Sequence, residues 1–380
     1  MVEMKKTLLV GAIYGILIGL LALTLPLFLD SQGYSIESIG WIFGIAALIS
    51  GILGIGLGAL SDRFGRRPLI MLYQLLIGGA AVTIGWGGSL STFIGGKSLS
   101  DFSGSGLWNI LISRISDISE IKKRAFHFGR YIFLFGIAYA LAHYLAGSVI
   151  ESFGFQMVFL IVIAFALLGT IITFFFVEKG KRKEKHHFSL EILKTRNGKV
   201  NSLVSFCHGI GAGLVYTYVI YLFLANECMF TPVQIGLFIA ATAGIWAVSS
   251  FFMGSLVDKF GMKKSFLASA VINGAAWFGI SLFYSEFWPF FLFIVVDNIT
   301  YAMLDLSAIK ASSMIPKEEN LGRDVSLFGY SHTIGAIIAV TFAGMIAAVG
   351  YDYVFALRGF FFLVAGLLFW FGIKFKETEE

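Results

Sequence analysis

The sequence predicts an all-α integral membrane protein with twelve transmembrane helices, and three observations support this fold class. The chain of 380 residues has a mean hydropathy of +0.84, and only 13% of its residues are charged. Its apolar residues gather in twelve runs, each near the roughly 20 residues that a helix needs to cross a membrane. A polar segment in the middle separates six runs from six. An ordinary soluble domain is excluded, because about 25% of its residues would be charged.

Helix signals agree with the boundaries of these runs. The first run is too long for a signal peptide and lacks a small-residue cleavage site, so we interpret it as a retained span. Pro68 and Pro232 stand where the first turn of a helix tolerates proline, and Thr231 can cap the eighth span. Only the fourth run, which includes Lys97 and Asp101, is weak by hydropathy. The predicted spans are 7–29, 37–60, 68–88, 90–113, 128–150, 155–177, 200–225, 232–255, 265–284, 288–311, 325–349 and 353–374.

The charges predict the topology. With the N-terminus in the cytoplasm, every Lys and Arg except Lys97 and Arg358 lies in a cytoplasmic loop or at a cytoplasmic helix end, as expected of cytoplasmic loops in general. The outer side is marked by acidic residues instead: Asp30, Glu151, Glu227, Glu286 and Asp352. We therefore expect a multi-pass protein of the cell membrane with both termini in the cytoplasm. The formal charge of +5 reflects this topology rather than a nucleic-acid partner.

The longest polar segment divides the chain into two domains. We predict an N-terminal six-helix bundle over 1–177, a cytoplasmic linker over 178–199 and a C-terminal six-helix bundle over 200–380. The linker is basic, so it either connects the bundles as a solvated segment or also rests on anionic lipid headgroups.

An internal repeat relates the two halves. The stretch "GALSDRFGRRPLI" at 58–70 returns in looser form as "GSLVDKFGMKK" at 254–264, and "GFQMVF" at 154–159 returns as "GYDYVF" at 350–355. One offset of 196 residues, without gaps, relates both pairs and also carries Asp101 onto Asp297. The repeat indicates duplication, and membrane proteins built from such repeats bind ligands near the bilayer midplane between the halves.

At these loops the sequence resembles the major facilitator superfamily of secondary transporters. The loop after the second span matches the signature of that family, and the 6+6 layout covers the whole chain. The resemblance implies pseudo-symmetric six-helix bundles and a gating role for Asp62, which would face the N-terminal end of the eleventh span, where a carboxylate is favoured. The alternative is that the loop serves only as a topology signal. The gating residues it implies are Gly58, Asp62, Arg63, Gly65, Arg66, Arg67, Gly254, Asp258 and Gly261.

The fourth span meets a second pattern of the family in part. The proton-coupled exporters of the superfamily carry an Arg and a Gly where this chain has Lys97 and Asp101. Their fifth-span proline is missing from "GIAYALAHYLAG".

Ionisable residues at membrane depth are costly, so each needs a partner, a water-filled cavity or a function. The resemblance implies that spans one, four, seven and ten line a central cavity, where the substrate and proton site would comprise Lys97, Asp101, His208, Asp297 and Asp305. Tyr216, Tyr218, Tyr301 and His332 are secondary candidates.

Structural roles stay open for several of these residues. Lys97 and Asp101, four apart on one helix, could be a self-neutralised pair. Asp305 could pair with His332 at similar depth, and His208 could be a hydrogen-bonded packing residue. We expect His143 and Arg358 to lie near the outer interface, where they snorkel to water as structural residues.

These observations predict a secondary transporter that works by alternating access. The five site residues carry one positive and three negative charges, a net charge of −2 with His208 neutral, which protons or a cationic substrate would relieve. We therefore expect proton-coupled export of amphiphilic cationic or neutral compounds, with Asp101 and Asp297 as proton carriers. The alternatives are proton symport of a small organic solute and, outside transport, a receptor or lipid scramblase.

The expected partners are a small-molecule substrate, protons and membrane lipids, with no nucleic acid, and the expected state is a monomer. The sequence shows no nucleotide-binding loop, catalytic constellation or Cys and His spacing typical of a metal site, so we expect no enzyme, cofactor or metal.

Overall fold

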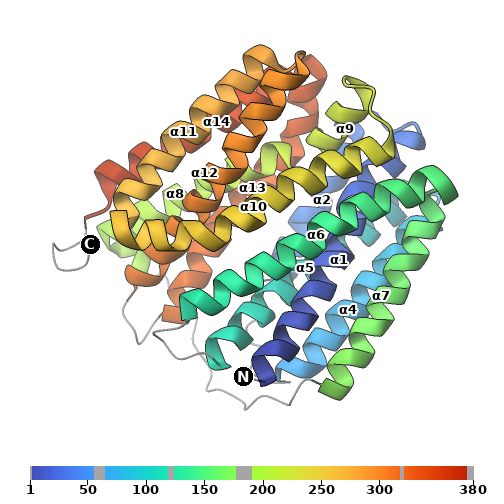
Figure 1. Cartoon of the computed structure of the whole chain (residues 1–380), viewed down its shortest axis with the longest axis horizontal. Helices are drawn as coiled ribbons and strands as arrows, with labels where there is room; N and C mark the ends of the chain where they lie inside the picture. The colour runs from blue at the N-terminus through green and yellow to red at the C-terminus, as the bar shows by residue number, and fades with distance from the viewer. Residues whose placement is uncertain (1, 55–64, 119–123, 177–190, 317–320, 375–380) are drawn as a thin grey trace. The chain divides into compact units, whose positions relative to one another are not determined.

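The fold is built from helices. A computed structural model describes residues 2–54, 65–118, 124–176, 191–316 and 321–374, and these contain helices, turns and no strand (Figure 1). This confirms the all-α class. In the first half the helices are α1 (Val2–Ser31), α2 (Ile36–Gly54), α4 (Arg66–Gly85), α5 (Leu90–Ile118), α6 (Arg124–Phe153) and α7 (Phe155–Phe176). In the second half they are α8 (Arg196–Val215), α9 (Val219–Asn226), α10 (Pro232–Phe260), α11 (Met262–Phe283), α12 (Phe287–Met314), α13 (Leu321–Val349) and α14 (Tyr351–Gly372), preceded by a short 3-10 helix, Glu191–Lys194.

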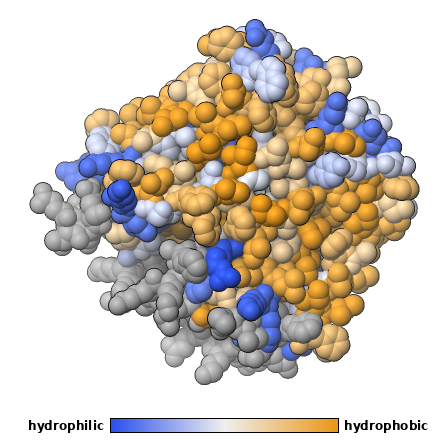
Figure 2. Space-filling model, viewed as in Figure 1, coloured by the Kyte–Doolittle hydropathy of each residue, from blue (hydrophilic) through white to orange (hydrophobic). Residues whose placement is uncertain are grey.

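Helix length and composition agree with a multi-pass membrane protein. In the described part of the chain, eleven segments are long and apolar enough to cross a membrane, with α8 and α9 together forming one of them. The fourth predicted span is the exception by hydropathy, yet α5 is a helix of 29 residues. Large apolar side chains cover much of the visible helical surface (Figure 2), as expected where lipid replaces water.

The seventh span differs from its prediction. We expected one continuous helix over 200–225, but α8 ends at Val215 and α9 begins at Val219, so Tyr216–Tyr218 form a turn inside the span. A broken helix leaves backbone carbonyl groups without helical partners, and these need other donors inside a membrane.

Contacts divide the chain into two compact units. Unit 1 comprises 1–185 and 221–247, and unit 2 comprises 186–220 and 248–380. The boundary between residues 220 and 221 falls close to the turn in the seventh span. The division into 1–177, 178–199 and 200–380 remains a prediction.

In unit 1, α1 packs closely against α6, beside α4 and α7 (Figure 1). Gly15 and Gly19 allow this approach, because a Cβ atom there would lie 2.5 Å from the carbonyl oxygen of Phe135 and 2.6 Å from that of Tyr139. Small residues at such interfaces let membrane helices pack backbone to backbone.

In unit 2, α11 packs against α12 and α14, while α8 packs against α13 and α14. The fully buried Trp277 of α11 contacts Phe355 of α14, with 5.7 Å between ring centroids. Of these helices, α8, α11, α12 and α14 surround the most buried charges of the described chain.

The backbone reproduces the internal repeat. Helices α7 and α14 begin and end 196 residues apart. Gly65, just before α4, and Gly261, just before α11, have φ angles of +80° and +82°. Both positions therefore adopt the left-handed backbone that glycine tolerates best.

Candidate functional site

The first copy of the signature loop is described only at its end. Gly58, Asp62 and Arg63 lie outside the described residues, and Gly254 of the second copy lies within α10. Arg66 begins α4, and the Arg67 guanidinium lies 4.8 Å from the Phe174 ring centroid and donates to the carbonyl oxygen of Phe174.

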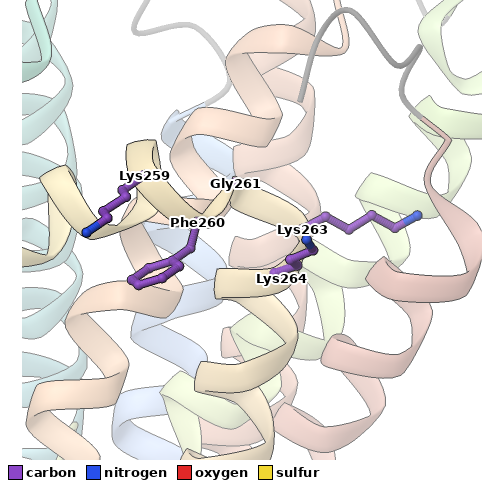
Figure 3. Close-up of a pocket in the computed structure, with 5 residues that line it drawn as sticks. All are labelled: Lys259, Phe260, Gly261, Lys263 and Lys264. Atoms are coloured by element: carbon purple, nitrogen blue, oxygen red, sulfur yellow. The ribbon is translucent and has the colours of Figure 1, made fainter.

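The second copy of the loop forms an ion pair and a shallow pocket. Asp258 accepts a hydrogen bond from Lys310 Nζ at 2.6 Å, which links α10 to α12. A pocket of about 170 Å³ surrounds Gly261 and is lined by three lysines and Phe260. Figure 3 shows the side chains of Lys259 and Lys263 pointing away from one another. The lysines therefore do not converge on a common ligand position.

Lys97 and Asp101 form an ion pair along one face of α5. The Lys97 ammonium also lies 4.6 Å from the ring centroid of Phe43 on α2. Their side chains are 15% and 27% exposed, so both charges remain within reach of solvent or a ligand. The predicted pairing is confirmed in geometry.

Asp297 of α12 lies at the centre of a buried hydrogen-bond network. Its Oδ1 accepts from Asn273 Nδ2 at 2.8 Å and from Trp277 Nε1 at 2.7 Å, both on α11. Its Oδ2 accepts from the hydroxyl of Tyr216, at the turn of the seventh span. The carboxylate side chain is only 1% exposed, and both of its oxygens accept hydrogen bonds from neighbouring side chains.

The position predicted for Arg358 is wrong. Its side chain is fully buried, with Nη2 3.5 Å from Asp297 Oδ1, and Nη1 donates to the carbonyl oxygens of Gly211 at 2.6 Å and Ala212 at 3.4 Å. Four aromatic rings surround the guanidinium, with centroids 4.6 to 5.6 Å from Cζ: Tyr216, Trp277, Phe362 and Tyr301. The cation stays buried because α8, α11, α12 and α14 supply an anion, carbonyl groups and ring faces for it.

A second polar cluster lies in the same unit. Asp305 Oδ1 is 3.3 Å from His208 Nε2, and the rings of His208 and His332 meet edge to face at 5.2 Å. The alternative that paired Asp305 with His332 is therefore wrong, because the imidazole beside Asp305 is that of His208. Among the described residues, Asp305 has no Lys or Arg partner, and its side chain is 30% exposed.

The position predicted for His143 is also wrong. The residue is fully buried in unit 1, and its Nε2 lies 2.9 Å from the hydroxyl of Tyr221. Its Nδ1 lies 2.8 Å from the carbonyl oxygen of Tyr139, one helical turn earlier. Both ring nitrogens thus have partners in the protein instead of reaching water.

These contacts sort the predicted site residues into two groups. Lys97 and Asp101 lie together in unit 1, whereas unit 2 brings together His208, Asp297, Asp305, Tyr216, Tyr301 and His332. Tyr216, Tyr301 and Asp305 keep part of their surface exposed, so two aromatic side chains and a carboxylate are partly accessible. Tyr218 is buried and donates to the carbonyl oxygen of Val340.

Sequence reasoning missed Asn273, Trp277 and the role of Arg358. An arginine inside an apolar run signals a buried partner by its cost alone, so Arg358 could have been assigned to the network. Asn273 and Trp277 carry no such signal, because amide and indole groups are tolerated in many membrane helices. Among the described residues there is also no group of three or more His, Cys, Asp or Glu residues suited to a metal ion.

Comparisons with known proteins agree on the family. A family model described as the Major Facilitator Superfamily matches residues 7–197 and 202–380. An uncharacterised MFS-type transporter of Methanocaldococcus jannaschii is 24% identical and covers 92% of this chain and 93% of its own. Multidrug resistance protein 2 of Bacillus subtilis is 23% identical, and the match covers 91% of this chain and 89% of that protein. The solved structure of the nucleoside transporter NupG matches with a TM-score of 0.80 at 12% identity, over 98% of this chain and all of that one, which shows the shared fold.

Proposed function

The chain belongs to the major facilitator superfamily, and on this premise we propose that it is a proton-coupled secondary transporter that exports amphiphilic cationic or neutral small molecules. The family and fold are those of transporters rather than enzymes. The chain is a multi-pass membrane protein.

The observation that carries the proposal is the environment of Asp305. This carboxylate is partly exposed, lies 3.3 Å from a histidine ring and is flanked by the ring of Tyr301, itself 5.7 Å from His208. Among the site residues of unit 2, Arg358 balances the charge of Asp297. The charge of Asp305 then remains when His208 is neutral. A proton or an organic cation can neutralise that charge, and competition between them is the simplest basis for exchange.

The geometry leads us to propose Asp305, in place of Asp297, as the aspartate that exchanges a proton in unit 2. Asp297 is almost fully buried beside Arg358, and its two oxygens already accept hydrogen bonds from three side chains, so it lacks the access that an exchanging proton needs. Asp305 has the partner and the exposure that proton exchange requires. We therefore assign proton exchange in unit 2 to Asp305, and retain Lys97 and Asp101 as the candidate pair of unit 1.

Similarity over most of the chain to a protein named for multidrug resistance supports export of chemically varied amphiphiles. The second candidate is proton symport of a small organic solute, which the missing fifth-span proline favours. We also propose that the protein is a monomer of the cell membrane with both termini in the cytoplasm, with lipids and no nucleic acid as partners.

Transport into liposomes tests the proposal. Purified protein is reconstituted with an acidic lumen, the membrane potential is clamped, and uptake of ethidium, an amphiphilic cation, is followed against protein-free liposomes. Antiport predicts accumulation that requires the acidic lumen and disappears in Asp305→Asn. Accumulation only when the outside is acidic would favour symport, and uptake unaffected by either gradient would reject proton coupling.

A further inference from the structure

The turn inside the seventh span depends on two side chains from other helices. The last carbonyl groups of α8 lack partners within the helix, because the helix stops at Val215. Arg358 donates at 3.4 Å to the carbonyl oxygen of Ala212, one of these last groups, and at 2.6 Å to that of Gly211, one residue before them. The Thr217 hydroxyl donates to the carbonyl oxygen of Gly213. A cation at a helix C-terminus also interacts favourably with the helix dipole.

Both the hydroxyl and the ring of Tyr216, the first residue of the turn, contact other helices. Its hydroxyl donates to Asp297 and lies 3.4 Å from Asn298 Nδ2. Its ring lies 4.6 Å from the Arg358 guanidinium and meets the Trp277 ring edge to face at 6.0 Å. The same ion pair therefore fixes both the end of α8 and the orientation of Tyr216.

Arg358 does not use all of its hydrogen-bond donors in this pair. The Nε and Nη2 atoms of Arg358 are buried without a hydrogen-bond partner, and Nη2 lies 3.5 Å from Asp297. The guanidinium is thus aligned to the carbonyl groups and ring faces at the turn more closely than to its counterion. This alignment suits a planar, forked cation and not the point charge of a lysine.

From these contacts we infer that Arg358 and Asp297 form a fixed clamp that holds the turn of the seventh span and positions Tyr216 on the exposed face beside Tyr301 and Asp305. Both are positioning residues, since they are almost fully buried and act through Tyr216, whose hydroxyl donates to Asp297 and whose ring lies against Arg358. The role in substrate binding rests on the proposed function, whereas the clamp itself does not.

Hydrogen–deuterium exchange of purified full-length protein tests the clamp without any substrate. Arg358→Lys keeps the charge and loses the fork, and we expect exchange over residues 211–220 to rise about tenfold or more. Arg114→Lys is the matched control, because Arg114 is a buried arginine of unit 1 that donates to Glu3 at 2.6 Å. It is expected to leave exchange at the turn unchanged.

A milder variant keeps the test decisive if Arg358→Lys does not fold. Trp277→Phe removes one donor from Asp297 and leaves both charges in place, so it is expected to raise exchange at the turn by a smaller factor. Wild-type exchange at the turn in both variants, or in the milder variant alone if the other is unfolded, would overturn the clamp.

Ethidium transport tests the positioning role. Arg358→Lys and Tyr216→Phe are expected to raise the ethidium KM several-fold while the pH profile keeps its wild-type midpoint. An unchanged KM, or a shifted midpoint, would overturn positioning by the pair. If wild-type protein does not transport ethidium, the substrate class in the proposed function fails, and the exchange result still decides the clamp.

Discussion

Asp101 and Asp297 occupy equivalent positions in the two halves, yet each has a cation of different origin. Lys97 reaches Asp101 along the same helix, whereas Arg358 reaches Asp297 from α14. The offset of 196 residues carries Lys97 onto Phe293, so the second half has no lysine at that position.

The surroundings of the two aspartates differ as much as their partners. The repeat positions of Asn273 and Trp277, which donate to Asp297, are Ile77 and Ala81 in the first half. Asp101 is 27% exposed, whereas Asp297 is 1% exposed. The two halves therefore share an aspartate at the same repeat position, but its partners and its exposure differ between them. We therefore propose that the first pair, Lys97–Asp101, responds to a ligand and that the second, Arg358–Asp297, is part of the scaffold.

The largest expected effect is the loss of protein stability when the Arg358–Asp297 pair is broken. Arg358→Gln leaves Asp297 buried without its cation, which costs about 3–5 kcal/mol in cases of this kind. Thermal unfolding in detergent should show a large loss of stability relative to wild type. A loss no greater than that of Lys97→Gln would remove the distinction between scaffold and responsive pair.

A buried neutral contact should give an intermediate effect. His143→Phe keeps a ring on α6 but removes the two buried hydrogen-bond contacts of the imidazole, with the Tyr221 hydroxyl and with the Tyr139 carbonyl oxygen, at a cost of about 0.5–1.5 kcal/mol each. The same unfolding assay measures it, with Tyr221→Phe as the matched control that removes the hydroxyl itself. If both variants match wild type, the contact contributes nothing.

Among the three contacts, the Lys97–Asp101 pair should contribute least to the stability of the protein. Lys97→Gln breaks a partly exposed ion pair, so the stability change should not exceed about 1 kcal/mol. Its effect should appear in transport instead, as a changed KM for ethidium. A stability loss equal to that of Arg358→Gln would make Lys97 a scaffold residue too.

The smallest effect concerns two thiols on either side of the turn. Burial, and then the charge of Glu227, raise the pKa of Cys228 to about 11. The protonated thiol therefore persists through neutral pH, and alkylation should accelerate as pH rises toward that value. Cys207→Ser leaves Cys228 as the only cysteine, so the alkylation rate against pH reads it directly. A rate that levels off near pH 8 would contradict the raised pKa.

The sequence was sufficient for the fold because hydropathy and loop charge act locally along the chain. The all-α class and most of the long helices therefore follow from the sequence, the family follows from the signature loop, and the Lys97–Asp101 pair follows from spacing within one helix. The Asp297 network joins residues from different helices, and no spacing rule relates Trp277 to Asp297. Arg358 and His143 were misplaced because position near a span end was taken as access to water. The turn at Tyr216 was missed because hydropathy continues through it.

The division of roles among the aspartates is tested most directly by counting protons. Ethidium is added to purified protein in weakly buffered detergent solution, and proton release is measured for wild type, Asp101→Asn and Asp305→Asn. If ethidium competes with a proton at Asp305, wild type and Asp101→Asn release up to about one proton per bound cation, and Asp305→Asn releases none. Release that persists in Asp305→Asn and disappears in Asp101→Asn would contradict this assignment and return the exchanging proton to the first half.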